Sequence, residues 1–409
     1  MKKTAQLARQ MIKAIGCANG LAGRQLGCEN AVEVIKASPY FTNVQQRIPL
    51  EWGKIIEEVN TGRHASALSG VTQTCRQLAH ETRQVIENKD ELLVFGGDHS
   101  CAIGTWSGVA TAMRPHGDIG LIWVDAHMDA HTPDTSDTGN IHGMPVAHLL
   151  GFGDKNLVRI GDRMPKLLPH NLCMVGIRDY ESAEQELLER LGVRIFYANE
   201  VEKRGIQDVM QEAQYLVTRN TIGYGLSIDL DGFDVSYAPA VGTPSADGIN
   251  ALEFIKALLT IDLTKLIATE IVEFLPRFDD NQRTSEQLVS SLVEYIYKTK
   301  QFQINSVNEI AARVNNNFFK TFSFKMARLE CKICTLEYKT NIAKLTPRIL
   351  TKCGHTLCES CCEILSNQNE TKDLICPFDR KMTKINRNVQ ELMKNFAITE
   401  YIDELSQTG

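Results

Sequence analysis

The run LIWVDAHMD at residues 121–129 decides how we interpret this chain. Its first four residues are apolar, as in a strand that is buried on both faces of a parallel sheet. Asp125, His127 and Asp129 follow at every second position, so an extended segment points their side chains to the same side. Ligands of open α/β sheets bind at the carboxyl ends of strands. We therefore expect these three side chains to meet at a binding site there.

Two other apolar runs end in the same kind of residue. Asp229 and Asp231 follow the run at 224–228, and His99 follows the run at 92–95. Taken alone, each of these pieces is more often a helix cap or a turn. Together, six ligand-type side chains from three strand ends can hold two cations, and oxygen ligands suit Mn²⁺ or Mg²⁺. Four clustered carboxylates also need bound positive charge, because like charges raise one another's pKa.

Apolar runs alternate with helical patterns from about residue 90 to 300. This alternation predicts an α/β fold with a parallel sheet sandwiched by helices. We expect strands at 92–95, 119–124, 172–175, 224–228 and 266–271, and helices at 184–191, 206–218 and 251–260. Before them we expect a strand at 12–15 and mostly helix at 51–90. A capping box of Thr284 and Gln287 predicts a helix that runs through Tyr297.

Composition places the chain among ordinary globular proteins. It has 409 residues, 43% of them hydrophobic, and a net charge of −6, which gives no electrostatic reason to expect binding to nucleic acid or to an anionic membrane. No apolar run approaches the ~20 residues that span a bilayer. The basic N-terminus has no apolar signal core after it. We therefore expect a protein of the cytoplasm.

Twelve cysteines are distributed very unevenly. Five are scattered over the first 330 residues, and in a reducing compartment they are interpreted as small buried apolar residues: Cys17, Cys28, Cys75, Cys101 and Cys173. The other seven form a dense cluster that also includes a His and an Asp, a composition that favours zinc over a disulfide framework. Two tetrahedral Zn²⁺ sites need eight ligands, and the pattern supplies Cys331, Cys334, Cys353, His355, Cys358, Cys361, Cys376 and Asp379, with Cys362 as a spare thiol.

Four segments resemble the signature motifs of the ureohydrolase (arginase) family: GGDHS at 96–100, DAHMD at 125–129, GNIHG at 139–143 and SIDLDG at 227–232. The resemblance covers about residues 10–300. It implies a site with two Mn²⁺ ions that hydrolyses a guanidino group to urea and an amine. By motif position, the resemblance implies six metal ligands, two of the Asp groups bridging the ions: His99, Asp125, His127, Asp129, Asp229 and Asp231.

The resemblance also implies roles around the metals. Bound cations lower the pKa of water to ~7 and so supply a hydroxide that attacks the guanidinium carbon. Asp129 is placed to hold or relay its proton. His142 matches the proton shuttle to the leaving amine, a general acid–base task. Glu273, in VEFLP at 272–276, matches the family's guanidinium-binding carboxylate, and we favour this role over a surface charge at a strand end. Thr243, in GTP at 242–244, is expected to line the pocket.

The substrate's far end is where this sequence departs from the family. The motifs GNIHG and GIRD (176–179) look more like arginases than agmatinases, so L-arginine, converted to L-ornithine and urea, is the expected substrate. At the carboxylate-contacting positions stand His131 and Thr138, where Asn and Ser are usual. At the amino-contacting position stands Glu181, where Asp is usual. His131 could donate to a carboxylate or favour another guanidine such as agmatine.

The cysteine pattern resembles a RING finger over about 55 residues. In such fingers the first and third ligand pairs hold one Zn²⁺ and the second and fourth pairs hold the other, and metal binding supplies the folding energy. Asp379 stands where Cys is commoner. The resemblance implies a ubiquitin ligase in which Ile333, Pro377 and Arg380 contact a ubiquitin-conjugating enzyme and ubiquitin. A purely structural or docking zinc module is the alternative.

The leading hypothesis is a bifunctional chain that joins a Mn²⁺ guanidino hydrolase to a RING-type ubiquitin ligase. The alternatives are an inactive arginase-like scaffold that binds targets for the RING, and a hydrolase whose RING serves docking or dimerisation. We expect the hydrolase at 1–305, a connector at 306–327, the RING at 328–384 and a helical tail at 385–409. The family also implies a homo-oligomer, a trimer or hexamer. Ubiquitin transfer needs a eukaryotic cytosol, so a delivered microbial effector would explain the pairing.

Overall fold

The computed structural model describes residues 11–315 and most of 331–392. Outside the described residues lie 1–10, 316–330, 393–409 and, within the C-terminal part, 332, 335, 337, 340, 341, 351, 353–355, 369–372, 378, 379, 386 and 387. The chain divides into two compact units, Met1–Asn316 and Asn317–Gly409, which are described separately.

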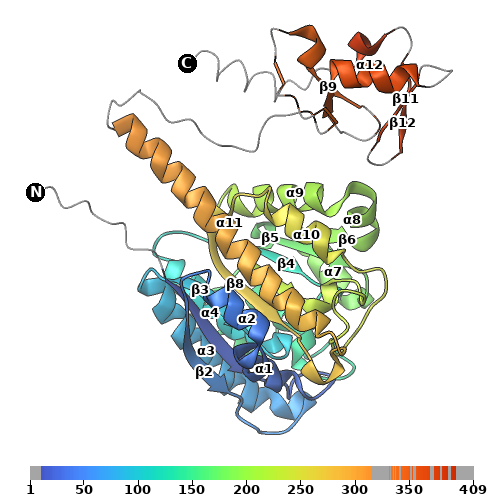
Figure 1. The fold of residues 1–409 in the computed structure, drawn as a ribbon. Helices are drawn as coiled ribbons and strands as arrows, with labels where there is room; N and C mark the ends of the chain where they lie inside the picture. The colour runs from blue at the N-terminus through green and yellow to red at the C-terminus, as the bar shows by residue number, and fades with distance from the viewer. Residues whose placement is uncertain are drawn as a thin grey trace, which may run out of the picture. The chain divides into compact units, whose positions relative to one another are not determined.

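The first unit is built on one eight-stranded sheet whose neighbouring strands all run parallel (Figure 1). The strand order is β2-β1-β3-β8-β7-β4-β5-β6. The predicted α/β fold is therefore confirmed. The strands are β1 (Ile12–Ala18), β2 (Leu50–Glu57), β3 (Glu91–Phe95), β4 (Gly120–Val124), β5 (Leu172–Ile177), β6 (Arg194–Tyr197), β7 (Tyr224–Asp229) and β8 (Leu266–Val272).

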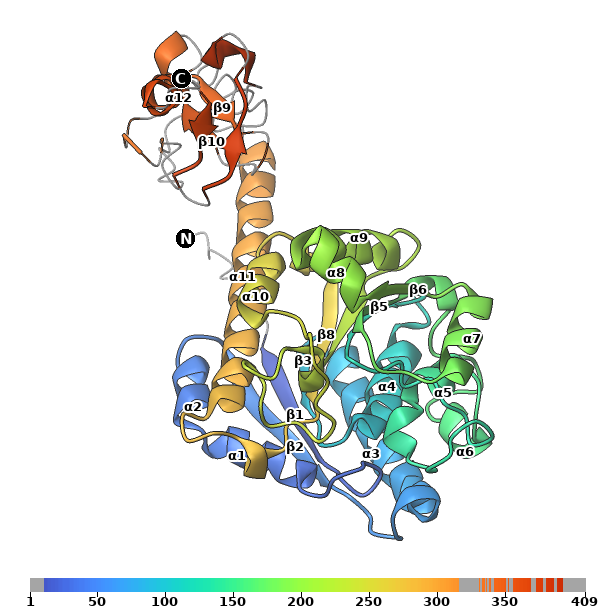
Figure 2. The ribbon, with the colours of Figure 1, turned by 90° about the vertical axis from the view of Figure 1, so that its right-hand side faces the viewer.

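Successive side chains of the central strands enter two hydrophobic cores, one on each face of the sheet. In β3, Leu93 and Phe95 join one core, and Leu92 and Val94 join the other. Figure 2 shows the two helical layers on either side of the sheet. One layer holds α1 (Ala31–Ala37), α2 (Pro39–Gln45), α8 (Ala198–Arg204), α9 (Ile206–Thr218), α10 (Ala251–Leu258) and α11 (Thr284–Asn315); the other holds α3 (Leu68–Glu87), α4 (Ala102–Met113), α5 (Pro145–Leu149), α6 (Lys155–Val158) and α7 (Ser182–Leu191).

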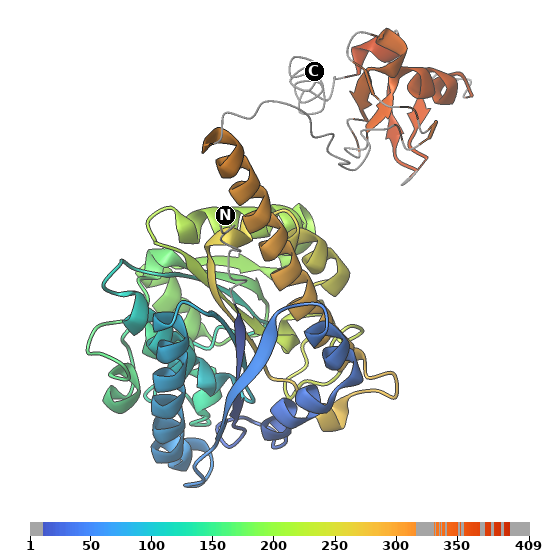
Figure 3. The same cartoon turned by 60° about the vertical axis from the view of Figure 1, so that its left-hand side comes forward.

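The prediction of mostly helix at 51–90 is wrong for its first residues, which form β2. This strand lies at the outer edge of the sheet and, among the described residues, pairs with β1 alone (Figure 3). Edge strands carry charged residues, and the sequence EWGKIIE therefore lacks the apolar run by which we identified the inner strands. The predicted strand at 12–15 is confirmed as part of β1, whereas β6 was not predicted.

Helix α11 begins where we predicted but is capped differently. The carboxylate of Asp279 accepts hydrogen bonds from the backbone N–H groups of Ser285 and Glu286, at 3.0 and 3.1 Å, and the side chain of Gln287 donates to a carbonyl instead of closing a capping box. The helix continues past Tyr297 to Asn315, because 298–315 contains neither Pro nor Gly. Residues 306–315 of the predicted connector are therefore helical.

In the second unit, the described residues form two short hairpins and one helix around a small core. Strands β9 (Pro347–Ile349) and β10 (Thr356–Cys358) pair antiparallel, as do β11 (Leu374–Ile375) and β12 (Met382–Thr383), and α12 (Glu359–Asn367) packs against β11. The core includes Val389 and Leu392, so the start of the predicted tail packs on this unit. The rest of that tail, from residue 393, lies outside the described residues.

Candidate functional site

The six predicted ligands of the sheet domain lie together at the carboxyl ends of β3, β4 and β7. Nδ1 of His99 is 3.2 Å from Oδ2 of Asp125 and 3.1 Å from an oxygen of Asp129 and of Asp229. All four side chains are almost entirely buried. One imidazole nitrogen and three carboxylates from separate loops thus point at one spot, as the ligands of a cation do.

A second set of ligands shares a member with the first. Nδ1 of His127 lies 3.4 Å from Oδ1 of Asp125 and 3.1 Å from Oδ2 of Asp231. Because Oδ2 of Asp125 faces His99 while Oδ1 faces His127, this carboxylate lies between the two sets. The geometry fits a pair of cations joined by a bridging carboxylate.

His99 is oriented by neighbours that we did not predict. Its ring stacks on Trp123, with ring centroids 4.1 Å apart, and its Nε2 lies 3.1 Å from the hydroxyl of Ser227. That hydroxyl donates a 2.7 Å hydrogen bond to the buried Glu270 of β8. Nδ1 is thereby turned toward the carboxylates. Ser227 is part of the SIDLDG motif and could have been found there, whereas nothing in the sequence marks Glu270.

The charges of the cluster fit bound cations. Burial raises the pKa of Asp129 to about 6, helped by the charge of Asp125, and raises the pKa of Asp229 as well. Burial alone would lower the pKa of His99 and His127, but the surrounding carboxylates outweigh it and raise both. Moreover, Nδ1 of His99 and Oδ2 of Asp129 are buried without a hydrogen bond. Cations would satisfy both atoms and neutralise the carboxylates.

His142 and Glu273 form a pair beside the metal ligands. Nδ1 of His142 lies 3.1 Å from Oε1 of Glu273, and the same oxygen accepts a 2.8 Å hydrogen bond from the backbone N–H of His99. Burial disfavours the charged imidazole, but the hydrogen bond to Glu273 and its charge raise the pKa of His142 to about 9. Glu273 has a φ of 60°, and Asp129 one of 49°. Left-handed backbone at a residue other than glycine is typical of functional sites.

Residues far away in the sequence form hydrogen bonds with Glu273 and with Asp98, the neighbour of His99. Cys28 donates through its thiol to Oε2 of Glu273 at 3.6 Å, and Asp98 accepts hydrogen bonds from Asn19 and from the backbone of Ala22. Asp98 stands within GGDHS, but Cys28 and Asn19 carry no recognisable signal. As expected, all five scattered cysteines are buried.

The second unit gathers four of the eight predicted zinc ligands. The sulfurs of the first and third pairs converge, as cross-bracing requires: Cys331, Cys334, Cys358 and Cys361. Burial opposes ionisation of Cys331, but backbone N–H groups that point at its sulfur lower its pKa to about 7. Thiolates this close together need a cation between them, and four sulfurs are a ligand set typical of structural Zn²⁺.

The other predicted residues of this unit are only partly described. Cys376 is buried, and so is the spare thiol Cys362. Ile333 is 42% exposed, and Arg380 is exposed as well, so both are accessible to a partner, while Pro377 is half-buried. Cys353, His355 and Asp379 lie outside the described residues, so their ligand roles stay predictions.

Comparison with known proteins agrees with both sites. The Arginase family matches residues 15–297, and the RING-type zinc-finger family matches residues 331–377. The chain belongs to the arginase family. It is 38% identical to the arginase of Bacillus caldovelox over 224 residues, which are 54% of this chain and 74% of that protein, and 36% identical to the arginase of Bacillus subtilis over 242 residues, 58% and 80% of the two chains. Both predicted resemblances are confirmed.

Solved arginase structures share the fold of the sheet domain. The B. caldovelox arginase superposes with a TM-score of 0.66 at 31% identity, covering 70% of this chain and 98% of that one. The Entamoeba histolytica arginase in complex with L-ornithine gives 0.64 at 27% identity with the same coverage. Within the described residues, none of the helices combines the length and apolar character needed to cross a lipid bilayer.

A small cavity of about 340 Å³ opens onto the arginase-like centre. Thr243 lies in its wall and donates a 2.8 Å hydrogen bond to Oδ2 of Asp231, as a pocket-lining residue would. Arg178, which we did not predict, donates to the carbonyls of Ser245 and Ala246 and so holds the loop after Thr243. The lining residues are Arg24, Gln25, His127, Asp179, Gly242, Thr243 and Pro244.

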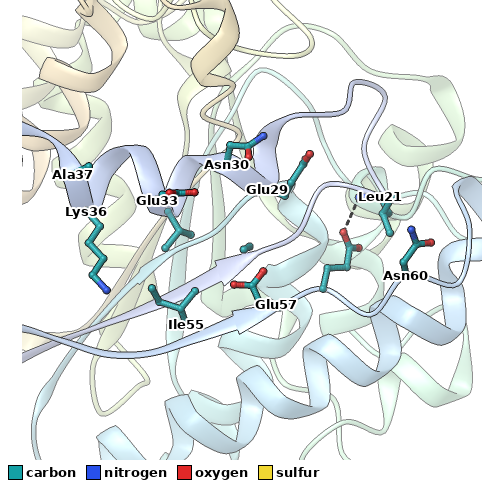
Figure 4. Close-up of a pocket in the computed structure, with 12 residues that line it drawn as sticks. Leu21, Glu29, Asn30, Glu33, Lys36, Ala37, Ile55, Glu57 and Asn60 are labelled. Carbon is teal, nitrogen blue, oxygen red and sulfur yellow. Dashed lines mark hydrogen bonds between the residues drawn. The ribbon is translucent and has the colours of Figure 1, made fainter.

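A larger hollow of about 700 Å³ lies elsewhere, between α1 and the ends of β1 and β2 (Figure 4). Its wall is acidic, and burial raises the pKa of Glu58 there to about 7. None of the predicted ligands or catalytic residues lines it. The smaller cavity is therefore the candidate active-site pocket, because His127 of the ligand sets lies in its wall.

Two of the three residues predicted to contact the substrate's head group contact each other. Nε2 of His131 lies against Oε2 of Glu181, and its Nδ1 lies 3.1 Å from the hydroxyl of Thr135. Thr138 is exposed, and its hydroxyl accepts a hydrogen bond from the backbone N–H of Asn140. His131 and Glu181 are therefore brought together, whereas Thr138 contacts neither of them among the described interactions.

Proposed function

We propose that this chain hydrolyses a guanidino compound with the help of two Mn²⁺ ions, and that L-arginine is converted to L-ornithine and urea. The observation that carries the proposal is the carboxylate of Asp125, which lies between two ligand sets in a chain of the arginase family. The pair of His142 and Glu273 adjoins these ligands through the backbone of His99. The side chains that we propose for substrate binding, proton transfer and metal ligation therefore lie close together.

Each role follows from the position and charge of the group. The buried carboxylate of Glu273 holds the guanidinium by charge-assisted hydrogen bonds. His142 keeps its proton at neutral pH, because its pKa is raised to about 9, and can pass it to the leaving amine. Asp129, buried and itself one of the predicted ligands, holds a proton of the attacking water. Two bound cations supply the positive charge that makes this water a nucleophile near neutral pH.

The experiment is a urea assay on the full chain after loading with Mn²⁺. We expect urea from L-arginine and much less from agmatine, because His131, Thr138 and Glu181 stand at the positions where the family contacts an amino-acid head group. Asp125→Asn should abolish urea release, since it weakens both ligand sets at once. Preference for agmatine would correct the substrate but keep the reaction. No urea from any guanidine would leave the domain as a target-binding scaffold and refute the proposal.

We also propose that the RING unit recruits a ubiquitin-conjugating enzyme and acts as a ubiquitin ligase. The supporting observation is that the first and third cysteine pairs converge while Ile333 between the first ligands stays exposed. Autoubiquitination is expected with at least one of a panel of conjugating enzymes. Ile333→Ala should lose ubiquitin chains and keep urea release. If chains never form, the RING is a docking module; if Ile333→Ala loses both activities, the two units do not act separately.

A further inference from the structure

A third group of ligand-type side chains, at the start of α7, shares no residue with the two metal-ligand sites described above. Nε2 of His131 contacts Oε2 of Glu181 and lies 3.4 Å from Oε2 of Glu184. These three atoms lie within 4.8 Å of one another, and none of the three residues belongs to the other ligand sets. Glu184 is 3% exposed, so this is not a loose cluster of surface charges.

His131 is held between Thr135 on one side and the two carboxylates on the other. The hydroxyl of Thr135 accepts a 2.9 Å hydrogen bond from the N–H of Thr132 and donates to the carbonyl of the same residue at 3.3 Å. The same hydroxyl lies 3.1 Å from Nδ1 of His131. Nε2, on the other side of the ring, points at Glu181 and Glu184. A metal-bound histidine is held in this way by its other nitrogen.

The two carboxylates are fixed in position. Glu184 accepts hydrogen bonds from the backbone N–H groups of Ala130, at 2.9 Å, and of Glu181, at 3.0 Å, and forms a capping box with Glu181 at the start of α7. Two carboxylate oxygens and an imidazole nitrogen that converge in this way need a proton or a cation between them. A proton serves one pair of atoms, whereas a metal ion serves all three.

We propose that His131, Glu181 and Glu184 form a third cation site, which takes Zn²⁺. One imidazole nitrogen and two carboxylate oxygens suit this ion, and three protein ligands leave a position open for water or for a substrate group. One consequence rests on the proposed arginine hydrolysis, because we expect His131 and Glu181 to contact the amino-acid head group of arginine. Zn²⁺ bound there competes with arginine, so it raises KM and leaves kcat unchanged.

The test is Zn²⁺ uptake by the full chain, already loaded with Mn²⁺ and with RING zinc, in equilibrium dialysis at pH 8. We expect one further Zn²⁺ per chain, with at least tenfold weaker binding in His131→Ala and in Glu181→Gln. Glu181 is 72% exposed, so its replacement should leave the fold intact. Glu186→Gln, an exposed position on the same helix, is the matched control and should bind Zn²⁺ like the parent.

Two results would overturn the proposal. One is equal Zn²⁺ uptake by the parent and by both site variants. His131, Glu181 and Glu184 would then share a proton and bind no metal ion. The other is uptake matched by released Mn²⁺, which would be exchange at the arginase-like centre. Zn²⁺ uptake is measured without arginine. The cation site can therefore be confirmed even if the protein releases no urea from arginine. Conversely, an active hydrolase that takes up no further Zn²⁺ refutes the cation site alone.

Discussion

Replacing Ser227 by alanine tests whether the hydroxyl behind His99 prepares this histidine for metal binding. The Ser227 hydroxyl donates its hydrogen to Glu270 at 2.7 Å, so toward Nε2 of His99, 3.1 Å away, it acts as an acceptor. Nε2 then carries the ring hydrogen, and Nδ1 presents its lone pair to the site that it shares with Asp125. Without the hydroxyl, the ring loses the contact that fixes this tautomer and orientation.

The expected effect lies in metal affinity rather than in folding. Removing such an outer partner weakens metal binding by roughly 10- to 100-fold, which corresponds to about 1.4–2.8 kcal/mol. Glu270 keeps the 2.9 Å hydrogen bond from Trp106, so the buried carboxylate is not left without a donor. We therefore expect Ser227→Ala to fold and to need roughly 10- to 100-fold more Mn²⁺ for half-saturation.

Equilibrium dialysis with Mn²⁺ measures this directly, and the Mn²⁺ dependence of urea release gives a second reading. Ser290→Ala is the matched control, because Ser290 is also buried but its hydroxyl has no hydrogen-bond partner among the described residues. Equal Mn²⁺ affinity of the two variants would show that the hydroxyl does not prepare His99, and the reasoning would fail.

Three further predictions concern other groups. Cys28→Ala removes a weak donor from Glu273, so kcat/KM should fall about 3- to 10-fold, which corresponds to about 0.7–1.4 kcal/mol, while dialysis shows unchanged Mn²⁺ binding. The pKa of His142 rises from 6.5 to about 9 on folding, so its stabilisation, at most about 3 kcal/mol, is complete below pH 6.5 and is lost as the pH rises through about 9. Denaturant unfolding of the parent and of His142→Asn between pH 6 and 10 should show this gap closing. Metal analysis should find about one Zn²⁺ fewer in Cys334→Ser and no loss in Cys362→Ser, whose thiol is outside the ligand pattern.

The inner strands and the convergence of the candidate ligands could be predicted, because both depend on short-range patterns. Strands buried on both faces read as apolar runs, and alternate residues at a strand end point to one side, so Asp125, His127 and Asp129 converge by geometry alone. The edge strand β2 could not be predicted in this way. Its residues are held by pairing with β1, some forty positions earlier in the chain, and its solvent-facing positions carry charges.

The supporting residues of the site were missed for a related reason. Cys28 and Glu273 are 245 residues apart, and Glu270 reaches His99 only through Ser227. Such contacts arise from the order of strands in the sheet, where β8 lies between β3 and β7. A buried glutamate in the middle of an apolar strand is nevertheless a signal, because a charge in that place needs partners, and the partners here lead to His99, a predicted metal ligand.

The backbone shows where stability is given up for chemistry. Asp129 and Glu273 both adopt left-handed conformations, which cost about 1–2 kcal/mol at residues other than glycine. Each is held there by hydrogen bonds of its own backbone: the carbonyl of Asp129 accepts from Val146 at 2.9 Å, and the N–H of Glu273 donates to Gly97 at 2.8 Å. Glycine would adopt these conformations without strain but carries no carboxylate. The fold therefore keeps two strained acids at the positions where we propose that a proton and a guanidinium are held, and its neighbouring loops offset the strain.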